Sequence, residues 1–251
     1  MSPEPSGLLE RVSVSALDWK PTGTTQRNCT PTPHRLKHVY GLDEKSLHLL
    51  GYWDNSNIFI GAQQVAIETE GVEARRRVRV EFSNLLELAR AGRQVEHAVA
   101  VGSIPPELRQ VWSRMESEGV AVKLLERGAI QGGEQCVDQT LQTAMLRDAF
   151  DYNGNPGIAV LLTGDGAGFA DGVGFHADLE RMHRRGWRIE VLSWRHSCNR
   201  RMREWAEQTG NRKFVTLDDF YESITFLELP APGQPMAPPR DAVPVNLTNR
   251  P

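Results

Sequence analysis

Two aspartates follow apolar runs of this sequence, in positions where metal ions often bind. Asp54 comes directly after the run 48–53, and Asn57 follows three residues later. Asp165 lies in a Thr-Gly-Asp-Gly motif that follows the run 158–162. Because ligands bind at the carboxyl ends of parallel strands, the two carboxylates are expected to share one crevice. Clustered carboxylates repel one another unless a cation joins them, so the pattern predicts a divalent metal or phosphate site.

Two further aspartates could complete this cluster. Asp138 is expected at the start of a helix, after a glycine-containing loop that returns to the same edge of the sheet. Asp171 follows Asp165 by six residues within the glycine-rich run 164–174. Each acid also has a simpler interpretation. Asp54 could cap the next segment through an Asx turn, and Asp138 and Asp171 could stabilise helix N-termini.

A basic segment suggests a polyanionic partner. Residues 181–213 hold ten Arg and Lys residues against three Glu, although the formal net charge of the chain is −3. This local excess of seven positive charges predicts a face that contacts phosphate groups. Trp187, Trp194 and Trp205 lie in the same segment, where they could stack on bases or belong to the core. The residues expected to contact a nucleic acid are Arg184, Arg185, Arg195, Arg200, Arg201 and Arg203.

The elements that must position these residues alternate between strand and helix. Apolar runs typical of buried strands lie at 48–53, 95–101, 120–125, 158–162, 187–194 and 213–217. Helical periodicity lies between them at 76–91, about 105–117, 137–150, 175–185 and 199–208. This alternation is typical of βαβ units, and it predicts one α/β domain over residues 47–230 with a mainly parallel sheet.

Both ends of the chain are expected to lack regular structure. Residues 1–46 mix Pro, Thr and Ser without periodicity, and residues 231–251 carry six prolines, which predicts a disordered tail or a peptide ligand for a protein partner. Cys29, Cys136 and Cys198 lack the spacing of a disulfide framework or a zinc site. Since neither a secretory signal nor a membrane-spanning run is present, we expect a cytoplasmic protein with no membrane partner. The sequence is also compatible with a homo-oligomer.

The order of these motifs resembles the NYN-domain branch of the PIN-like ribonucleases. The resemblance covers about residues 46–230, and its most specific parts are Asp-x-x-Asn after the first strand and Thr-Gly-Asp after the fourth. It implies a Rossmann-like three-layer α/β/α sandwich of the PIN-like type, whose acidic residues bind Mg²⁺ or Mn²⁺ and hydrolyse single-stranded or structured RNA. By position, the catalytic metal-binding acids would be Asp54, Asp138 and Asp165, with Asn57 as a supporting residue and Asp171 as a further metal ligand.

Two departures from the family pattern keep alternatives open. The family often has a second acid two residues after Asp165, and this acid is absent here unless Asp171 replaces it. The helix after Asp138 often carries another acid, where this chain has Gln, Thr and Ala at 142–144. The leading hypothesis is a metal-dependent ribonuclease, and the second is an RNA-binding NYN module with a weakened metal site. A phosphatase of the haloacid-dehalogenase type is the third, although Ser56 stands where that family needs a second acid.

Overall fold

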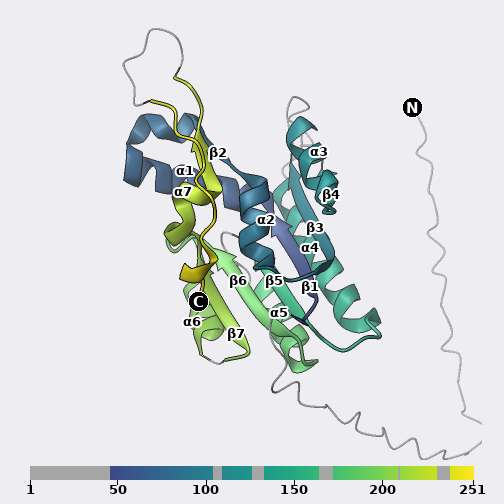
Figure 1. Ribbon diagram of the computed structural model, residues 1–251. Coiled ribbons are helices and arrows are strands. Elements are labelled where there is room, and N and C mark those ends of the chain that lie inside the picture. Colours follow the sequence, from purple (N-terminus) through teal and green to yellow (C-terminus); the bar gives the residue numbers. More distant parts are fainter. Residues whose placement is uncertain (1–45, 104–108, 126–132, 164–171, 209, 231–237) are drawn as a thin grey trace, which may run out of the picture. The chain divides into compact units, whose positions relative to one another are not determined.

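A parallel sheet forms the centre of the domain. The computed structural model describes residues 46–251 apart from 104–108, 126–132, 164–171, 209 and 231–237. The strands of the sheet are β1 (Leu49–Asp54), β3 (Val95–Ser103), β4 (Ala121–Leu125), β5 (Ile158–Leu162), β6 (Arg188–Ser193) and β7 (Arg212–Thr216). They lie in the order β4-β3-β1-β5-β6-β7, and every neighbouring pair is parallel (Figure 1). The predicted Rossmann-like α/β fold is therefore confirmed.

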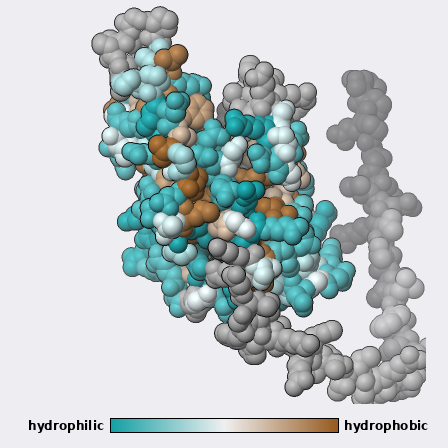
Figure 2. Space-filling model, viewed as in Figure 1, coloured by the Kyte–Doolittle hydropathy of each residue, from teal (hydrophilic) through white to brown (hydrophobic). Residues whose placement is uncertain are grey.

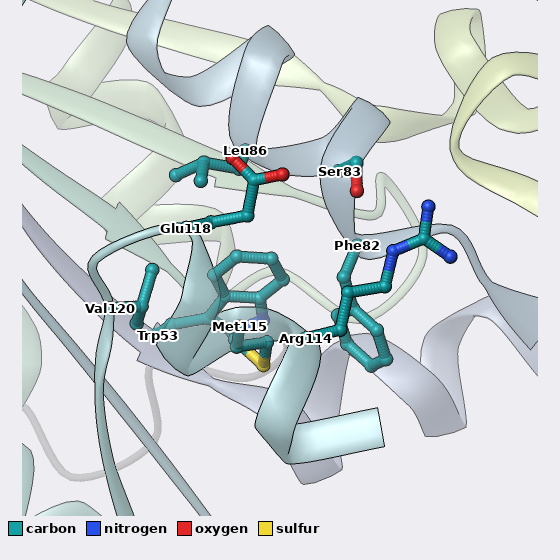
Figure 3. A pocket seen from close by; sticks show the side chains of 8 residues that line it. All are labelled: Trp53, Phe82, Ser83, Leu86, Arg114, Met115, Glu118 and Val120. Atoms are coloured by element: carbon teal, nitrogen blue, oxygen red, sulfur yellow. The ribbon is translucent and has the colours of Figure 1, made fainter. Parts of the chain in front are cut away.

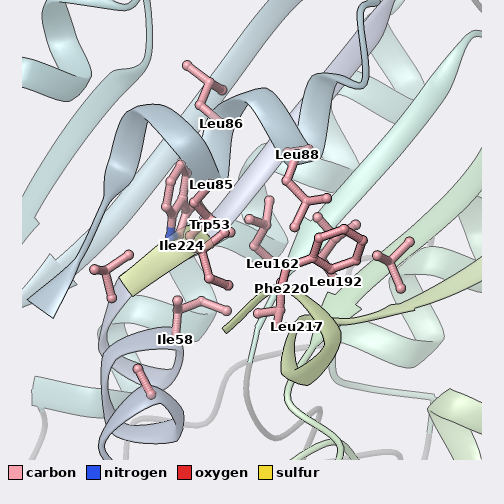
Figure 4. Close-up of a cluster of buried hydrophobic side chains, with 14 of the residues drawn as sticks. Trp53, Ile58, Leu85, Leu86, Leu88, Leu162, Leu192, Leu217, Phe220 and Ile224 are labelled. Carbon is pink, nitrogen blue, oxygen red and sulfur yellow. The ribbon is translucent and has the colours of Figure 1, made fainter. Parts of the chain in front are cut away.

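Helices cover both faces of this sheet. One face carries α1 (Asn55–Glu70), α2 (Phe82–Arg90) and α3 (Arg109–Ser117), and the other carries α4 (Gly133–Asp151), α5 (Phe175–Arg184) and α6 (Arg200–Glu207). Successive residues of β1 face opposite layers, as the pleat of a strand requires. Trp53 packs in the cluster that contains Ile58 and Leu85 (Figure 4), and Tyr52 packs in the cluster that contains Leu141. The result is a three-layer sandwich with two cores.

The strand order creates a switch point between β1 and β5. From β1 the chain crosses to β3 and β4, and α4 then brings it back to β5 on the other side of β1. The chain leaves β1 toward β3 and leaves β5 toward β6, in opposite directions. This divergence opens a crevice at the carboxyl ends of β1 and β5. Trp53 pairs with Leu162 across this boundary. Asp54 and Thr163, which directly follow these two residues, therefore lie at the mouth of the crevice.

The prediction of a helix over 76–91 is wrong in its first part, and α1 is missing from the prediction. Residues Val78–Val80 form β2, which pairs antiparallel with β8 (Thr225–Leu227), and α2 begins only at Phe82. The buried residues of α1 are mainly small, and its larger buried residues are isolated along the sequence. The apolar stripe of this helix is therefore weak in the sequence. The partner of β2 is far away in the sequence, and local periodicity carries no information about such a pairing.

Close packing of α1 depends on Gly61, which lies against Trp194. A Cβ atom added at Gly61 would lie 2.0 Å from Cδ1 of Trp194. The Trp194 side chain is fully buried, and its Nε1 donates a hydrogen bond to the Ile58 carbonyl at 2.9 Å. The indole is therefore held in place by both packing and a hydrogen bond.

We expect Gly61→Ala to lower the free energy of unfolding by about 1–3 kcal/mol, because the added methyl group overpacks the contact with Trp194. Helix propensity alone would favour alanine over glycine by about 1 kcal/mol, so the two effects have opposite signs. Urea denaturation measures the difference. Gln64→Ala, at an exposed position of the same helix, is the control and should change stability by less than about 0.5 kcal/mol. A Gly61→Ala variant as stable as the parent would contradict the packing argument.

The C-terminal residues 238–251 contact the domain, whereas the sequence predicts a disordered tail over 231–251. The Arg240 guanidinium lies 5.0 Å from the ring centre of Tyr221 and 3.1 Å from Oε1 of Glu70. The backbone of Arg240 also forms a β-bridge with Leu227. Prolines prevent regular helices and ladders, but they do not prevent an irregular segment from packing. The folded unit thus extends past the expected boundary at residue 230.

A buried ion-pair cluster holds the end of this segment. Glu190 is 3% exposed and accepts hydrogen bonds from Arg93 at 2.6 and 2.7 Å and from Arg250 at 2.5 Å. Burial alone would raise the pKa of the Glu190 carboxyl, but the two guanidinium groups outweigh burial and hold this pKa below its usual range. Arg250 also donates to the Leu88 carbonyl at 3.0 Å. The C-terminal segment is therefore bound to the central sheet by charge.

One face of the domain and its helices bear on the predicted absence of a membrane partner. The face shown in Figure 2 is mostly hydrophilic, with hydrophobic residues in scattered groups. Among the helices in the described ranges, none is long and apolar enough to cross a membrane.

Candidate metal centre and nucleic-acid groove

Asp54 ends β1 and also caps α1. Its side chain is 1% exposed. Its Oδ1 accepts a hydrogen bond from the Asn57 backbone N–H at 3.1 Å, and its Oδ2 accepts one from Asn57 Nδ2 at 2.6 Å. The predicted capping role is therefore confirmed, and the same contacts hold both carboxylate oxygens in one orientation. A carboxylate that is buried and held in this way is suited to binding a cation.

Two buried oxygen atoms close to Asp54 in the fold have no hydrogen-bond partner among the residues that the structure describes. They are Oδ1 of Asn55, the next residue in the chain, and Oγ1 of Thr163, which is fully buried at the end of the neighbouring strand. Leaving such a group unsatisfied costs about 1–3 kcal/mol, so a ligand at the crevice would offset an existing penalty. Carboxylate, amide and hydroxyl oxygens are hard ligands of the kind that Mg²⁺ and Mn²⁺ prefer. The residues present thus fit a divalent cation.

Asp138 lies on the second turn of α4 rather than at its start, because the helix begins at Gly133, four residues before the predicted Val137. The chain leaves β4 at the carboxyl edge of the sheet before it enters α4, which puts the half-buried Asp138 on the part of the helix nearest this edge. A position inside the helix gives less interaction with the helix dipole than a cap would. The sequence interpretation of Asp138 as a simple N-terminal residue is therefore wrong.

The predicted four-aspartate cluster stays a prediction. Asp165 and Asp171 lie in 164–171, outside the described residues. Over the remaining described ranges, no group of three His, Cys, Asp or Glu side chains is arranged to hold a metal ion. The described part of the centre consists of Asp54, Asn57 and the two unpartnered oxygens of Asn55 and Thr163, with Asp138 on the adjacent helix.

The six predicted RNA-contacting arginines divide between two edges of the sheet. Arg184 is the last residue of α5, and Arg185 follows it before the start of β6, so both lie at the amino edge, away from Asp54. The other four lie after β6, at its carboxyl end or on α6: Arg195, Arg200, Arg201 and Arg203. The segment 181–213 is thus not one basic face. Strand β6 runs from the amino edge to the carboxyl edge of the sheet between the two groups of arginines. A count of charges along the sequence does not reveal this change of edge.

A groove of about 380 Å³ begins at Asn57 and runs along α1. Its lining residues come from α1, from the short helix after it and from the loop after β6: Asn57, Ile60, Gly61, Gln63, Gln64, Glu68, Arg75, His196 and Ser197. Only Asn57 among them was a sequence candidate. The others were missed because α1 was not predicted. Their spacing along the sequence indicates a common surface only if the segment is a helix.

A second depression is filled by side chains and is not a ligand site. It lies between α2 and α3 over the Trp53 ring, beside Phe82 and Met115 (Figure 3). It leaves no room for a water molecule. We therefore regard it as part of the core packing.

Comparison with known proteins identifies the family. The family model for the NYN domain matches residues 51–209. The chain belongs to the NYN-domain family. This match contains most of β1 and all of β5, α4 and the groove. NYN domains are PIN-like nuclease or RNA-binding domains, so the resemblance seen in the sequence is confirmed.

Other comparisons add little to the NYN assignment. A crystal structure of a protein of unknown function, VPA0982 from Vibrio parahaemolyticus, is similar with a TM-score of 0.49 and 18% sequence identity, over 71% of this NYN chain and 97% of the other. No curated protein matches the chain.

Proposed function

We propose that this NYN domain is a metal-dependent ribonuclease whose active site lies in the crevice between β1 and β5. The observation that carries the proposal is the buried Asp54 carboxylate, held by two hydrogen bonds from Asn57 beside the unpartnered oxygens of Asn55 and Thr163. A centre of this composition at a topological switch point suits phosphate chemistry. The family assignment favours a nuclease over the phosphatase alternative.

The proposed ligands of Mg²⁺ or Mn²⁺ are Asp54, Asp138 and Asp165, with Asp171 as the replacement for the acid that the chain lacks. When bound, the metal supplies Lewis acidity, which lowers the pKa of water and stabilises charge on the phosphate. The chain's own residues prepare this site. Asn57 fixes the Asp54 oxygens, and the layers around β1 exclude bulk water from the carboxylate, which strengthens its attraction for a cation.

Incubation of the purified protein with end-labelled RNA tests this function. Single-stranded and hairpin RNA should be cleaved with Mn²⁺ or Mg²⁺, and EDTA should stop cleavage. Activity that persists in EDTA would contradict the proposal. An RNA-binding module without activity is the second candidate, because the sequence lacks the acid two residues after Asp165. That candidate predicts RNA binding without cleavage and without measurable Mn²⁺ binding by calorimetry.

The division of the arginines gives a matched pair of variants. Arg201 and Arg184 are both exposed, and neither side chain makes a hydrogen bond or ion pair within the described ranges. Arg201 lies at the start of α6 near the crevice, and Arg184 lies at the opposite edge. We expect Arg201→Ala to weaken RNA binding and to reduce the salt-dependence slope by about 0.7 for one lost contact with single-stranded RNA. Arg184→Ala should leave the slope unchanged. Equal effects would show that position in the fold does not matter.

A further inference from the structure

We infer that the groove along α1 binds one unpaired nucleotide of the substrate, so that the domain acts on single-stranded rather than fully paired RNA. This inference rests on the proposed nuclease function and concerns the same site. Asn57 connects the two, because its side chain lines the groove and also donates to Oδ2 of Asp54 at 2.6 Å. A nucleotide in the groove would therefore lie directly next to the reacting phosphate.

The charge of the groove favours a base over a phosphate. Among its nine lining residues only Glu68 and Arg75 carry formal charges, and these have opposite signs. A path for phosphate groups would need an excess of positive charge, and the exposed arginines of this edge, Arg195 in the loop after β6 and Arg200 and Arg201 on α6, are not among the lining residues. The remaining lining side chains are neutral hydrogen-bonding groups and one exposed aliphatic residue, Ile60, which is 54% exposed.

Two amides in the groove are held ready to contact the edge of a base. Gln63 donates from Nε2 to the Arg75 carbonyl at 3.3 Å, and Gln64 donates from Nε2 to Oε1 of Glu68 at 3.1 Å. Each bond uses one N–H and leaves the amide oxygen and the second N–H available, without another hydrogen bond to the residues that the structure describes. A paired donor and acceptor of this kind matches the Watson–Crick edge of an unpaired base.

The size of the groove agrees with a single nucleotide. Its volume of about 380 Å³ lies near the lower end of the range for small-molecule pockets, roughly 300–1,000 Å³. The exposed Ile60 side chain offers an apolar contact for the face of the base. In a duplex the base edges are already paired and stacked, so only an unpaired nucleotide can enter and use these groups.

The test measures RNA binding by fluorescence anisotropy in an Asp54→Asn background, which keeps the RNA intact. Ile60→Asp puts a charge on the apolar wall, and we expect it to weaken binding of a single-stranded 12-mer at least tenfold. Leu229→Asp is the matched control, since Leu229 is also an exposed aliphatic residue, at 75% exposure, and should bind as the parent does. Gln64→Ala should change the preference among homopolymers at least threefold while the melting curve stays unchanged.

Two results would overturn the inference while leaving the nuclease proposal intact. They are unchanged single-strand binding by both groove variants, or equal affinity of the parent for the 12-mer and for a blunt hairpin. Absence of any RNA binding by the parent protein would instead overturn the proposed function and the inference together. Because the binding readout does not depend on cleavage, these failures are distinguishable.

Discussion

If Asp54 is one of the proposed metal ligands, Asp54→Asn should reduce RNA cleavage at least about 100-fold, because the loss of this carboxylate would remove several kcal/mol of charge stabilisation. Asparagine is as good an N-cap as aspartate, so the free energy of unfolding should change by less than about 1 kcal/mol. RNA affinity should change little, since Arg201 and the groove-lining residues themselves are not substituted. Single-turnover cleavage, urea denaturation and anisotropy measure the three quantities.

A double variant separates the metal role of Asp54 from its structural role. Asp54→Asn places an amide opposite the Asn57 amide, across the 2.6 Å contact that joins a carboxylate oxygen to Nδ2 in the parent. The double variant Asp54→Asn with Asn57→Asp again has one hydrogen-bond donor and one acceptor across this contact. Its negative charge lies at position 57 instead of position 54. We expect this double variant to be as stable as the parent but not to regain cleavage. Recovery of cleavage would show that a carboxylate is not required at position 54 itself.

Asp165→Asn should resemble Asp54→Asn, and Asp171→Asn reports whether this residue replaces the family's second acid. If it does, cleavage falls and is partly restored by more Mn²⁺, because mass action refills a weakened site. Full activity of Asp171→Asn would limit the site to Asp54, Asp138 and Asp165.

Glu190→Gln is expected to lower the free energy of unfolding by about 3–5 kcal/mol, because it leaves two buried guanidinium groups without a negative partner. The Arg93 and Glu190 side chains are only 2% and 3% exposed, so water cannot replace the lost carboxylate. Glu204→Gln is the control, since Glu204 pairs with the exposed Arg200. Pairs of that kind contribute about 0–1 kcal/mol. Equal effects of the two substitutions in urea denaturation would contradict a stabilising role for the buried cluster.

The pH dependence of this difference follows from the lowered pKa of Glu190. A carboxyl with a lower pKa in the folded state stabilises the fold above its unfolded pKa, about 4.3, and loses this contribution as the pH falls through the folded value. The stability gap between the parent and Glu190→Gln should therefore be largest near neutral pH and should shrink in strong acid. A gap that does not change with pH would exclude ionisation of Glu190 as its cause.

The sequence predicts the central strands well because they are buried on both faces. The run at 158–162 is continuously apolar and corresponds to β5, and the run at 95–101, which is apolar apart from Glu96 and His97, corresponds to most of β3. Asp54 could also be predicted as a strand-end carboxylate. In contrast, α1 begins with three polar residues that are typical of a turn, and its buried positions include Gly61 and two alanines. Small residues give little hydrophobic contrast, so the periodicity that identifies a helix is weak here.

The features that the sequence could not predict depend on residues that are neighbours only in the folded structure. The groove joins α1 to His196 and Ser197, which lie more than 130 residues later in the chain. Packing of the proline-containing C-terminal residues depends on ion pairs with Glu70 and Glu190, and local composition does not reveal such partners. Two arginines lie at the same edge of the sheet or at opposite edges according to how many strands and helices separate them. This number follows from the topology of the fold and not from their distance along the sequence.

The contacts of the C-terminal segment also constrain how the protein can fold during synthesis. Arg240 and Glu70 are 170 residues apart, and Arg77 donates to the Glu228 carbonyl 151 residues away. Bringing such distant residues together has an entropic cost that grows with separation, so these contacts form late. A nascent chain on the ribosome can assemble β1, β3 and β4 early, but Arg77 and Glu70 form these contacts only after Glu228 and Arg240 have been synthesised. Until then this side of the domain exposes unpaired strand edges, the state in which binding by a chaperone would matter most.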